Sequence, residues 1–288
     1  MSTITATNFR TDAARFPAIA MAPDVAEPTG RVGVASAARV VAARTLRQFW
    51  RTPQLIVVGA LTSAMFLLIF RYVFGGAIAT GPVSYADFLI PGLAAAGAMF
   101  SGTGAAVGVA EDVDSGLYDR LRSLPIPRIG VLFGRSLADV ALVAWGVVIT
   151  VALGFATGFR IHGGTGAALA AFGLCLIYGA AFTWPFIHMG LVAGNAQAAQ
   201  SMSFMAFPFV FVSSAYVPVE SMPGWMQPIA EHQPITAMVG SVRALTIGAD
   251  AEQVLGHSAG WFTVRALLWS AAIIAVFAPL AVRRFARS

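Results

Sequence analysis

The sequence predicts an all-α polytopic membrane protein with six transmembrane helices. Hydrophobic residues make up 58% of the 288 residues and charged residues only 11%, whereas about 25% of the residues of a soluble domain are charged. The apolar residues also gather in runs of about 20, the length that a helix needs to cross a bilayer. The six predicted spans are residues 55–74, 88–110, 137–159, 167–192, 200–219 and 262–282.

The stretch before the first span predicts two further elements. Residues 1–37 mix Thr, Ala, Pro, Asp and Arg without any period, which indicates a disordered cytoplasmic tail, and residues 38–285 form the transmembrane domain. Residues 38–51 predict an amphipathic helix in the membrane interface, because their arginines share one face and their large apolar side chains another. The arginines are Arg44, Arg47 and Arg51, and the apolar side chains are Leu46, Phe49 and Trp50, with Trp50 at headgroup level. The alternative is a polar extension of the first span.

Arginine placement predicts that both termini are cytoplasmic. All 18 basic residues are arginine, and the basic residues of membrane proteins gather in cytoplasmic segments. With cytoplasmic termini, the inside holds the arginines of segments 39–51, 120–135 and 283–287. The outside then holds Arg160 and Arg243, while Arg71 and Arg265 lie near outer helix ends, from which their side chains can reach the interface. The positive charge is therefore explained by a multi-pass plasma-membrane protein, and no nucleic-acid partner is expected.

The sequence contains no recognisable catalytic centre. A P-loop requires a lysine on the nucleotide phosphates, and this chain has no lysine. Sets of cysteine and histidine with metal-ligand spacing are missing, and the single cysteine, Cys175, lies in an apolar run. His188 falls inside a span, where it is either a functional group or a neutral histidine hydrogen-bonded to another helix; Asp139 is expected to pair locally with Arg135. We therefore expect a chain that is not an enzyme and binds no metal or cofactor itself.

The charged window EDVDSGLYDRLRSLPIPR, residues 111–128, predicts a short helix on the cytoplasmic surface. Three leucines share one face at i, i+4 and i+7 spacing: Leu117, Leu121 and Leu124. The segment PIP, which begins at Pro125, then stops the helix. An ordered and charged helix indicates a docking surface, and an interfacial helix with solvated charges is the open alternative.

The segment 218–248 predicts two short outer helices. Pro223 can open the first and Pro234 the second, because proline suits the first helical turn. The second helix ends at Gly248, and its apolar stripe consists of Ile235, Met238, Val239, Val242 and Leu245. Both helices are too short to span a membrane, so we expect interfacial or re-entrant elements on the outer half of the bundle.

Together these segments resemble the permease subunit of type-2 ATP-binding-cassette exporters, in particular the daunorubicin-resistance-type drug and complex-lipid permeases of actinobacteria. The resemblance covers roughly residues 38–285, and its most specific part is the outer stretch MPGWMQPIAEHQPITAMVGSVRAL. The inner stretch SGLYDRLRSLPIPR is the second match, although many relatives carry Gly-Thr where this chain has Ser115-Gly116.

The resemblance implies roles for both segments. In that family the cytoplasmic helix docks on a separate ATPase subunit, and two permeases and two ATPases form the complex. The residues carried over to this coupling role are Glu111, Leu117, Asp119, Arg120, Leu121, Arg122, Leu124 and Pro125. The outer helices help to close the exit, and the corresponding residues here are Pro223, Trp225, Gln227, Pro234, Met238 and Arg243. ATP and Mg²⁺ would bind only to the partner.

The expected function is therefore the export of hydrophobic or amphiphilic compounds (a drug, antibiotic, lipid or polyketide) across the bacterial plasma membrane. The alternative is a secondary transporter or channel that needs no ATPase. Such proteins often contain repeated halves, and residues 55–159 show no convincing similarity to residues 167–282. The sequence leaves open which compound is moved and whether the second permease is an identical or a related chain.

Overall fold

The computed structural model describes residues 33–287 apart from 79, 81 and 119–127, and it builds these residues into helices and connecting turns. The chain divides into two units, residues 1–31 and 32–288, and all described residues belong to the second. Most of the predicted tail, residues 1–37, therefore lies outside the described residues. The helix that follows the tail begins at Val34, before the predicted start at residue 38.

Within the described residues, five helices are long and apolar enough to cross a membrane. The first is α2 (Pro53–Leu68), which continues as the π-helix η1 (Ile69–Phe74). The second consists of α3 (Tyr85–Phe100) and α4 (Gly102–Asp114). The other three are α6 (Arg128–Ala156), α7 (Gly164–Ala193) and α13 (Ala259–Arg287). Each contains most of one predicted span, so the sequence located these helices correctly.

The predicted span 200–219 is not among them, and the count of six spans is not confirmed. The chain there forms α8 (Ala196–Ser203), the 3₁₀ turn η2 (Phe204–Ala206) and α9 (Phe207–Phe211). Pro208 lies at the start of α9, where its missing N–H interrupts the hydrogen-bond ladder of the preceding turn. Residues 212–218 are not helical. The apolar run is thus a broken helix followed by a turn.

Helix α1 (Val34–Arg51) confirms the predicted helix before the first span. It packs on the rest of the protein with neither the predicted arginine face nor the predicted face of large apolar side chains, but with a third face. Its buried residues are Ala37, Ala38, Ala42 and Thr45. These small side chains allow a close approach of α1 to α6, where a Cβ on Gly134 would lie 2.5 Å from the carbonyl oxygen of Ala38. Leu46 and Phe49 are half-buried and Trp50 is exposed, and the place of this helix in the membrane interface stays a prediction.

The segment 219–255 forms five short elements. They are η3 (Val219–Ser221), α10 (Gln227–His232), α11 (Pro234–Ile247), η4 (Gly248–Asp250) and α12 (Ala251–Leu255). Pro234 begins α11 and Gly248, with φ of 80°, ends it, as predicted. The predicted helix start at Pro223 is wrong. The Pro223 carbonyl instead closes a turn by accepting the N–H of Met226 at 2.8 Å, and α10 begins at Gln227 because Pro228 occupies its first turn.

Helix α11 packs inside the bundle against α3, α7 and α13. Twelve of its 14 residues are buried, and they include the polar residues Thr236, Ser241 and Arg243. A single apolar stripe on a surface helix therefore does not describe it, because every face of α11 meets another part of the protein.

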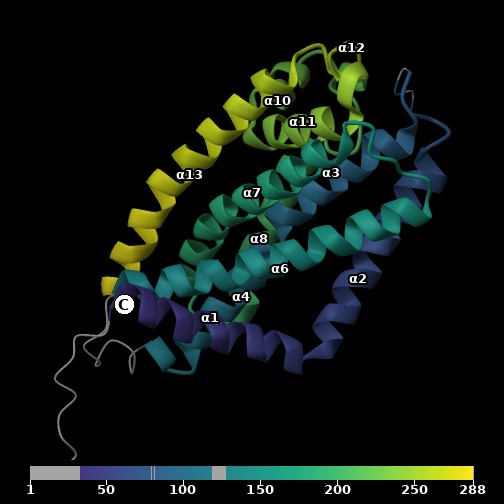
Figure 1. The fold of residues 1–288 in the computed structure, drawn as a ribbon. Coiled ribbons are helices and arrows are strands. Elements are labelled where there is room, and N and C mark those ends of the chain that lie inside the picture. Colours follow the sequence, from purple (N-terminus) through teal and green to yellow (C-terminus); the bar gives the residue numbers. More distant parts are fainter. Residues whose placement is uncertain (1–32, 79, 81, 119–127, 288) are drawn as a thin grey trace, which may run out of the picture. The chain divides into compact units, whose positions relative to one another are not determined.

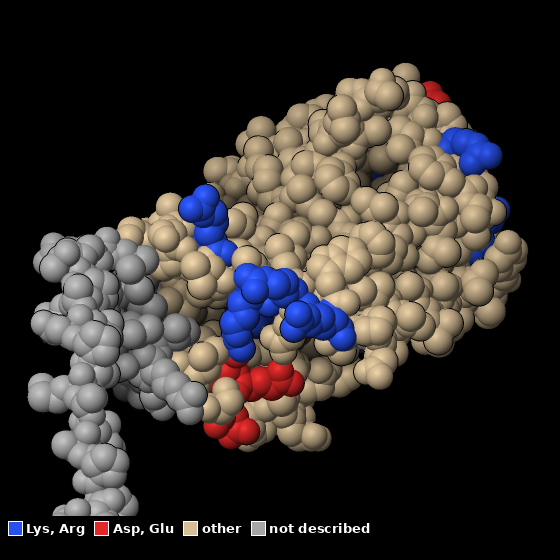
Figure 2. Space-filling model, turned by 60° about the horizontal axis from the view of Figure 1, so that its bottom comes forward, with Lys and Arg blue, Asp and Glu red and all other residues tan. Residues whose placement is uncertain are grey.

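The two ends of the bundle differ in composition. Helices α10, α11 and α12 gather at one end, called the α11 end from here on, and α1 lies at the opposite end with the last turn of α13 (Figure 1). This opposite end is called the charged end. Figure 2 shows basic and acidic side chains side by side there, on a face that is otherwise largely uncharged. The exposed charged residues of α1 and of the end of α4 are Arg39, Arg44, Arg47, Arg51, Glu111 and Asp114.

Candidate functional site

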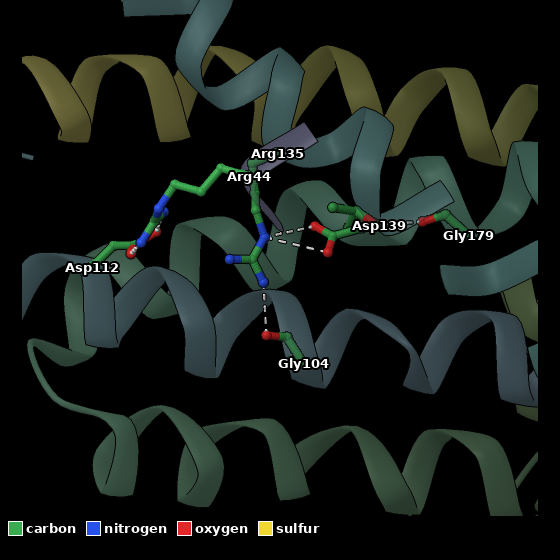
Figure 3. Close-up of polar contacts among 7 residues, drawn as sticks. Arg44, Gly104, Asp112, Arg135, Asp139 and Gly179 are labelled. Atoms are coloured by element: carbon green, nitrogen blue, oxygen red, sulfur yellow. Dashed lines mark hydrogen bonds and ion pairs between the residues drawn. The ribbon is translucent and has the colours of Figure 1, made fainter. Parts of the chain in front are cut away.

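An ion pair joins α1 to α4 at the charged end (Figure 3). Arg44 donates from Nη1 and Nη2 to the two carboxylate oxygens of Asp112, at 3.3 and 2.9 Å. Asp112 lies in the last turn of α4 and is buried. Because a bidentate arginine–carboxylate pair fixes the orientation of both side chains, this contact ties the helix before the first span to the end of the second span.

A second ion pair lies inside the bundle and confirms the predicted pairing of Asp139 with Arg135. The Nε atom of Arg135 lies 3.2 Å from a carboxylate oxygen of Asp139, one turn further along α6. Its Nη2 atom donates to the carbonyl of Gly104 in α4 at 3.0 Å. Asp139 is only 1% exposed. A Cβ on Gly108 would lie 2.6 Å from the guanidinium nitrogens, so Arg135 in this position packs directly on the backbone of α4.

Tyr118 anchors the start of the predicted docking helix. Leu117 and Tyr118 are helical and are the last described residues before the gap at 119–127. Tyr118 is buried, and its ring meets that of Phe285 in α13 edge-on, with 5.0 Å between the ring centres. Burial, followed by the nearby carboxylate of Asp112, raises the pKa of Tyr118 above its usual range, so the phenol is neutral. The chain is therefore held against α13 at Tyr118.

The structure describes two of the predicted coupling residues. Glu111 is exposed in the last turn of α4, and Leu117 is half-buried. The others lie outside the described residues: Asp119, Arg120, Leu121, Arg122, Leu124 and Pro125. Their docking role stays a prediction. Of the predicted interfacial residues, Arg47 and Arg51 are exposed, and Trp50 meets Trp145 of α6 edge-on at 5.4 Å between ring centres.

A cavity of about 970 Å³ lies between α1, α2, α3, α4, α6 and the α8–α9 segment. Its wall is largely aliphatic and aromatic, with hydroxyl groups between: the aromatic residues include Phe49, Phe66, Phe100, Trp145, Phe207 and Tyr216, and the hydroxyl groups include those of Thr62, Ser101 and Thr150. The charged residues in the wall are Glu111 and Arg135. A mostly apolar wall with a few placed polar groups suits an apolar or amphiphilic molecule.

Aromatic residues pack together at the α11 end of this cavity. The ring of Tyr216 stacks on Phe70, with 4.5 Å between the ring centres and 12° between the planes. It also contacts Phe211 at 5.2 Å and Phe66 at 6.5 Å. Phe66 and Phe70 belong to the first span and Tyr216 to the turn after α9, so this contact depends on where the turn is held.

Arg243 of α11 holds that turn. Its side chain is fully buried, and it donates to the backbone carbonyls of Phe88 at 2.9 Å, Ser214 at 2.8 Å and Ala215 at 3.3 Å. The guanidinium carbon also lies 3.5 Å from the centre of the Phe88 ring, close enough for a cation–π contact. The sequence analysis placed Arg243 on the outer side and did not predict that its side chain is buried. The residue joins α11, α3 and the turn rather than facing water.

Further side chains satisfy the remaining backbone groups of the turn. Thr236 accepts the N–H of Ser214 at 3.2 Å, and the Tyr85 hydroxyl donates to the carbonyl of Tyr216 at 3.1 Å. The Gln233 amide donates to the carbonyl of Val212. In a membrane protein, non-helical backbone persists only where protein groups or water satisfy it. These contacts explain how the helix can end at Phe211 inside the bundle.

The other predicted outer residues divide into two groups. Pro234 and Met238 lie on α11 with Arg243, and Met238 is buried. Gln227 donates to the carbonyls of Glu220 and Met222 at 3.3 and 3.0 Å. Trp225 is 71% exposed and is not part of the cluster around Arg243.

No group of three or more His, Cys, Asp or Glu side chains that could hold a metal ion is found among the described residues. The Nδ1 atom of His188 is buried and has no hydrogen-bond partner there. The predicted hydrogen bond from His188 to another helix is therefore not found at this atom.

The predicted docking segment includes Asp112 and Tyr118, but their individual contacts were not predicted, and Gly92 was not predicted as a site residue. Arg44 and Asp112 are 68 positions apart, so no local spacing relates them. A usable signal existed for Asp112, since a carboxylate at the end of an apolar span requires a partner. Gly92 gave no such signal, because only the fold reveals that a Cβ there would lie 1.9 Å from the carbonyl oxygen of Ala215.

Comparison with known proteins agrees with this geometry. A model of the ABC-2 type transporter family matches residues 36–247. The daunorubicin resistance ABC transporter permease protein DrrB1 of Streptomyces coeruleorubidus is 31% identical over 249 residues, which cover 84% of this chain and 85% of that protein. The probable doxorubicin resistance ABC transporter permease protein DrrC of Mycobacterium tuberculosis is 27% identical over 264 residues, which cover 88% and 93%. The chain therefore belongs to the ABC-2 type transporter family, as its sequence motifs implied.

Proposed function

We propose that this chain is the permease subunit of an ATP-driven exporter that moves hydrophobic or amphiphilic compounds outward across a bacterial plasma membrane. The observation that carries the proposal is the cavity of about 970 Å³ with an aromatic and hydroxyl-bearing wall. Two relatives whose names describe them as drug-resistance permeases support it. The chain supplies the route, while ATP and Mg²⁺ bind to a separate P-loop ATPase subunit.

The segment from Glu111 to Pro127 docks on that ATPase in this proposal, and the charged end is cytoplasmic. Movement of the docking segment reaches α13 through the contact of Tyr118 with Phe285. It reaches α1 through the pair formed by Asp112 and Arg44. The hydrogen bond from Arg135 to Gly104 links α4 to α6 in the wall of the cavity. The contacts around the docking segment thus lead directly to the proposed route.

The complex contains two permeases and two ATPases. Apolar side chains on α2 and on the α8–α9 segment are exposed beside the cavity, and they include Val58, Leu61, Met65, Phe204, Met205 and Phe209. A second permease, identical or related, covers part of these faces, and membrane lipids cover the rest. The route then lies between the two permeases.

Opening to the outside requires the stacked rings of Tyr216 and Phe70 to separate. Tyr216 moves with the turn that Arg243 holds, and Phe70 moves with η1 of the first span. The broken segment 196–218 acts as the fifth crossing, so that the chain crosses the membrane six times. ATP binding in the partner supplies the free energy for this separation.

Reversing the charge of Arg120 and Arg122 together is expected to uncouple transport from ATP hydrolysis while membrane insertion stays intact. Loss of a well-placed charged contact at an interface weakens binding by about 2 kcal/mol or more, which is more than tenfold in affinity. The measurements are co-purification of the ATPase with the R120E/R122E variant and substrate-stimulated ATP hydrolysis in vesicles that contain both subunits.

The matched control reverses two other arginines of the charged end, Arg39 and Arg283, which are exposed. This R39E/R283E variant is expected to retain the ATPase, because neither residue belongs to the docking segment. Normal export and a full ATPase response in R120E/R122E would contradict the docking assignment. Export by the purified chain in vesicles without any ATPase would contradict the proposed function and favour a secondary transporter.

A further inference from the structure

A second cavity opens beside α6 and α7 near the α11 end, and nothing in the export mechanism uses it. Its volume of about 330 Å³ is at the lower end of the range of ligand pockets. The walls come from α3, α6, α7 and α11, and the side chains in them are almost all aliphatic or aromatic. The one hydroxyl in the wall, that of Thr246, donates to the carbonyl of Arg243. The chemistry of this groove therefore suits a hydrocarbon chain.

The groove opens on exposed faces of helices that can span a membrane and is separate from the first cavity. Val148, Phe155 and Leu169 in its wall are 50%, 43% and 73% exposed, and all three belong to helices that can span a membrane. No residue lines both cavities. The groove follows α6 from Val147 to Phe155, a length of about 12 Å, close to the hydrocarbon depth of one leaflet, about 15 Å. A lipid chain can thus enter it from the side.

Arg160 lies next to the groove without lining it. Its neighbours in sequence, Phe159 and Ile161, both line the groove. Its Nη1 atom donates to the carbonyls of Phe159 at 2.8 Å and Phe155 at 3.3 Å, and its backbone N–H donates to Asp87 at 2.8 Å. The side chain is nevertheless exposed. Among the described residues, no carboxylate lies within 4.0 Å of its guanidinium. Among the described residues, Arg160 therefore presents an exposed positive charge without an ion-pair partner, four residues beyond the end of α6 at Ala156.

We propose that the groove and Arg160 form a binding site for an anionic phospholipid. One acyl chain lies in the groove between α6 and α7, and the phosphate pairs with Arg160. The occupant is a membrane lipid rather than a soluble ligand, because the groove opens along spanning helices and its polar contact is at one end only. In the proposed orientation this is a lipid of the outer leaflet.

The site also touches the cluster that holds the turn after α9. Val242 and Thr246 of α11 line the groove on either side of Arg243 in sequence. A bound chain therefore packs against the helix that carries Arg243. Binding is expected to raise the unfolding temperature, because a ligand that binds only the folded state stabilises it.

The test compares binding of phosphatidylglycerol and phosphatidylcholine with identical chains to the purified full-length protein, by native mass spectrometry. The wild-type protein is expected to bind phosphatidylglycerol more tightly. Arg160→Gln is expected to weaken phosphatidylglycerol binding about fivefold and to leave phosphatidylcholine binding unchanged. Ala168→Phe, which fills the groove from α7, is expected to weaken the binding of both lipids.

Two variants serve as matched controls. Arg265→Gln removes another arginine near the α11 end, which stacks on Trp261 at 4.2 Å and whose neighbours in sequence do not line the groove. Ala170→Phe places the same bulk on an exposed position of α7 outside the groove. Both are expected to bind lipid like the wild-type protein. Ala152→Phe, on the α6 wall, provides a second filled groove if Ala168→Phe does not fold.

Three results would overturn the proposal. Equal losses in Arg160→Gln and Arg265→Gln would mean that the lipid is attracted by surface charge in general. Unchanged binding in both groove-filling variants would mean that no chain lies in the groove. Glycerol phosphate that competes as well as phosphatidylglycerol would mean that the arginine binds an anion without a lipid chain. The test needs no ATPase, so its failure would leave the proposed export function untouched.

Discussion

Replacing Arg243 with methionine is expected to lower the free energy of unfolding by about 2–6 kcal/mol, because two buried carbonyls of the turn lose their donor at about 1–3 kcal/mol each. These are the carbonyls of Ser214 and Ala215, which accept from Nη2 at 2.8 and 3.3 Å. Methionine fills similar space but donates nothing, and the cation–π contact with Phe88 is lost as well. Thermal unfolding in detergent measures the loss, and transport in vesicles should fall with it.

Two further substitutions show whether the position of the turn is responsible. Gly92→Ala is expected to be similarly harmful, since the new Cβ would lie 1.9 Å from the Ala215 oxygen and 3.0 Å from Nη2 of Arg243. Gly97→Ala on the same helix is the matched control, because a Cβ there meets nothing within 4 Å. Wild-type stability of both Arg243→Met and Gly92→Ala would show that the turn needs neither the arginine nor the glycine.

Replacing Arg135 alone with methionine is expected to cost about 3–5 kcal/mol of unfolding free energy, because it leaves a buried carboxylate without its partner. Asp139 is 1% exposed and has Arg135 as its ion-pair partner at 3.2 Å. The hydrogen bond from Arg135 to Gly104, which links α6 to α4, disappears at the same time. The melting temperature in detergent and the yield of folded protein report the effect.

The double variant Arg135→Met with Asp139→Leu distinguishes two causes of instability: the lost hydrogen bond to Gly104, and the buried carboxylate of Asp139 left without an ion-pair partner. Because well-packed apolar residues often replace a buried ion pair without loss of stability, the double variant is expected to recover most of the melting temperature. If it is as unstable as Arg135→Met alone, the stranded carboxylate is not the cause. The stable double variant can then be assayed for transport, which tests the pair in the wall of the cavity separately from its effect on folding.

The five long helices could be predicted from the sequence because each is a continuous apolar run of sufficient length. The same criterion failed for residues 200–219, where the run is equally apolar but the backbone leaves the helix after Phe211. That departure depends on donors and acceptors supplied from elsewhere in the chain by Tyr85, Thr236 and Arg243. Hydropathy records the cost of burying side chains and contains no information on which distant group will satisfy a carbonyl.

The candidate site was predictable where its signal was local. The i, i+4 pair of Arg135 and Asp139 and the start of α11 at Pro234 follow from neighbours in sequence. Two other contacts join segments that are distant in sequence. They are the bidentate contact between Arg44 and Asp112 and the close packing of Gly92 against the carbonyl of Ala215. They arise from helix packing and could not be predicted from spacing. Alanine residues on α1 were overlooked for a related reason, since their contribution lies in close approach rather than in hydrophobicity.

The close contact of α1 with α6 has a mechanical consequence. Two helices whose backbones approach closely through Ala38 and Gly134 cannot slide into a new register without a clash, so we expect them to move together. Only Thr52 separates α1 from α2, which makes that residue a pivot. The first span, from Pro53 to Phe74, is then a lever about 33 Å long, and a tilt of about 10° at the pivot would carry its far tip through about 6 Å.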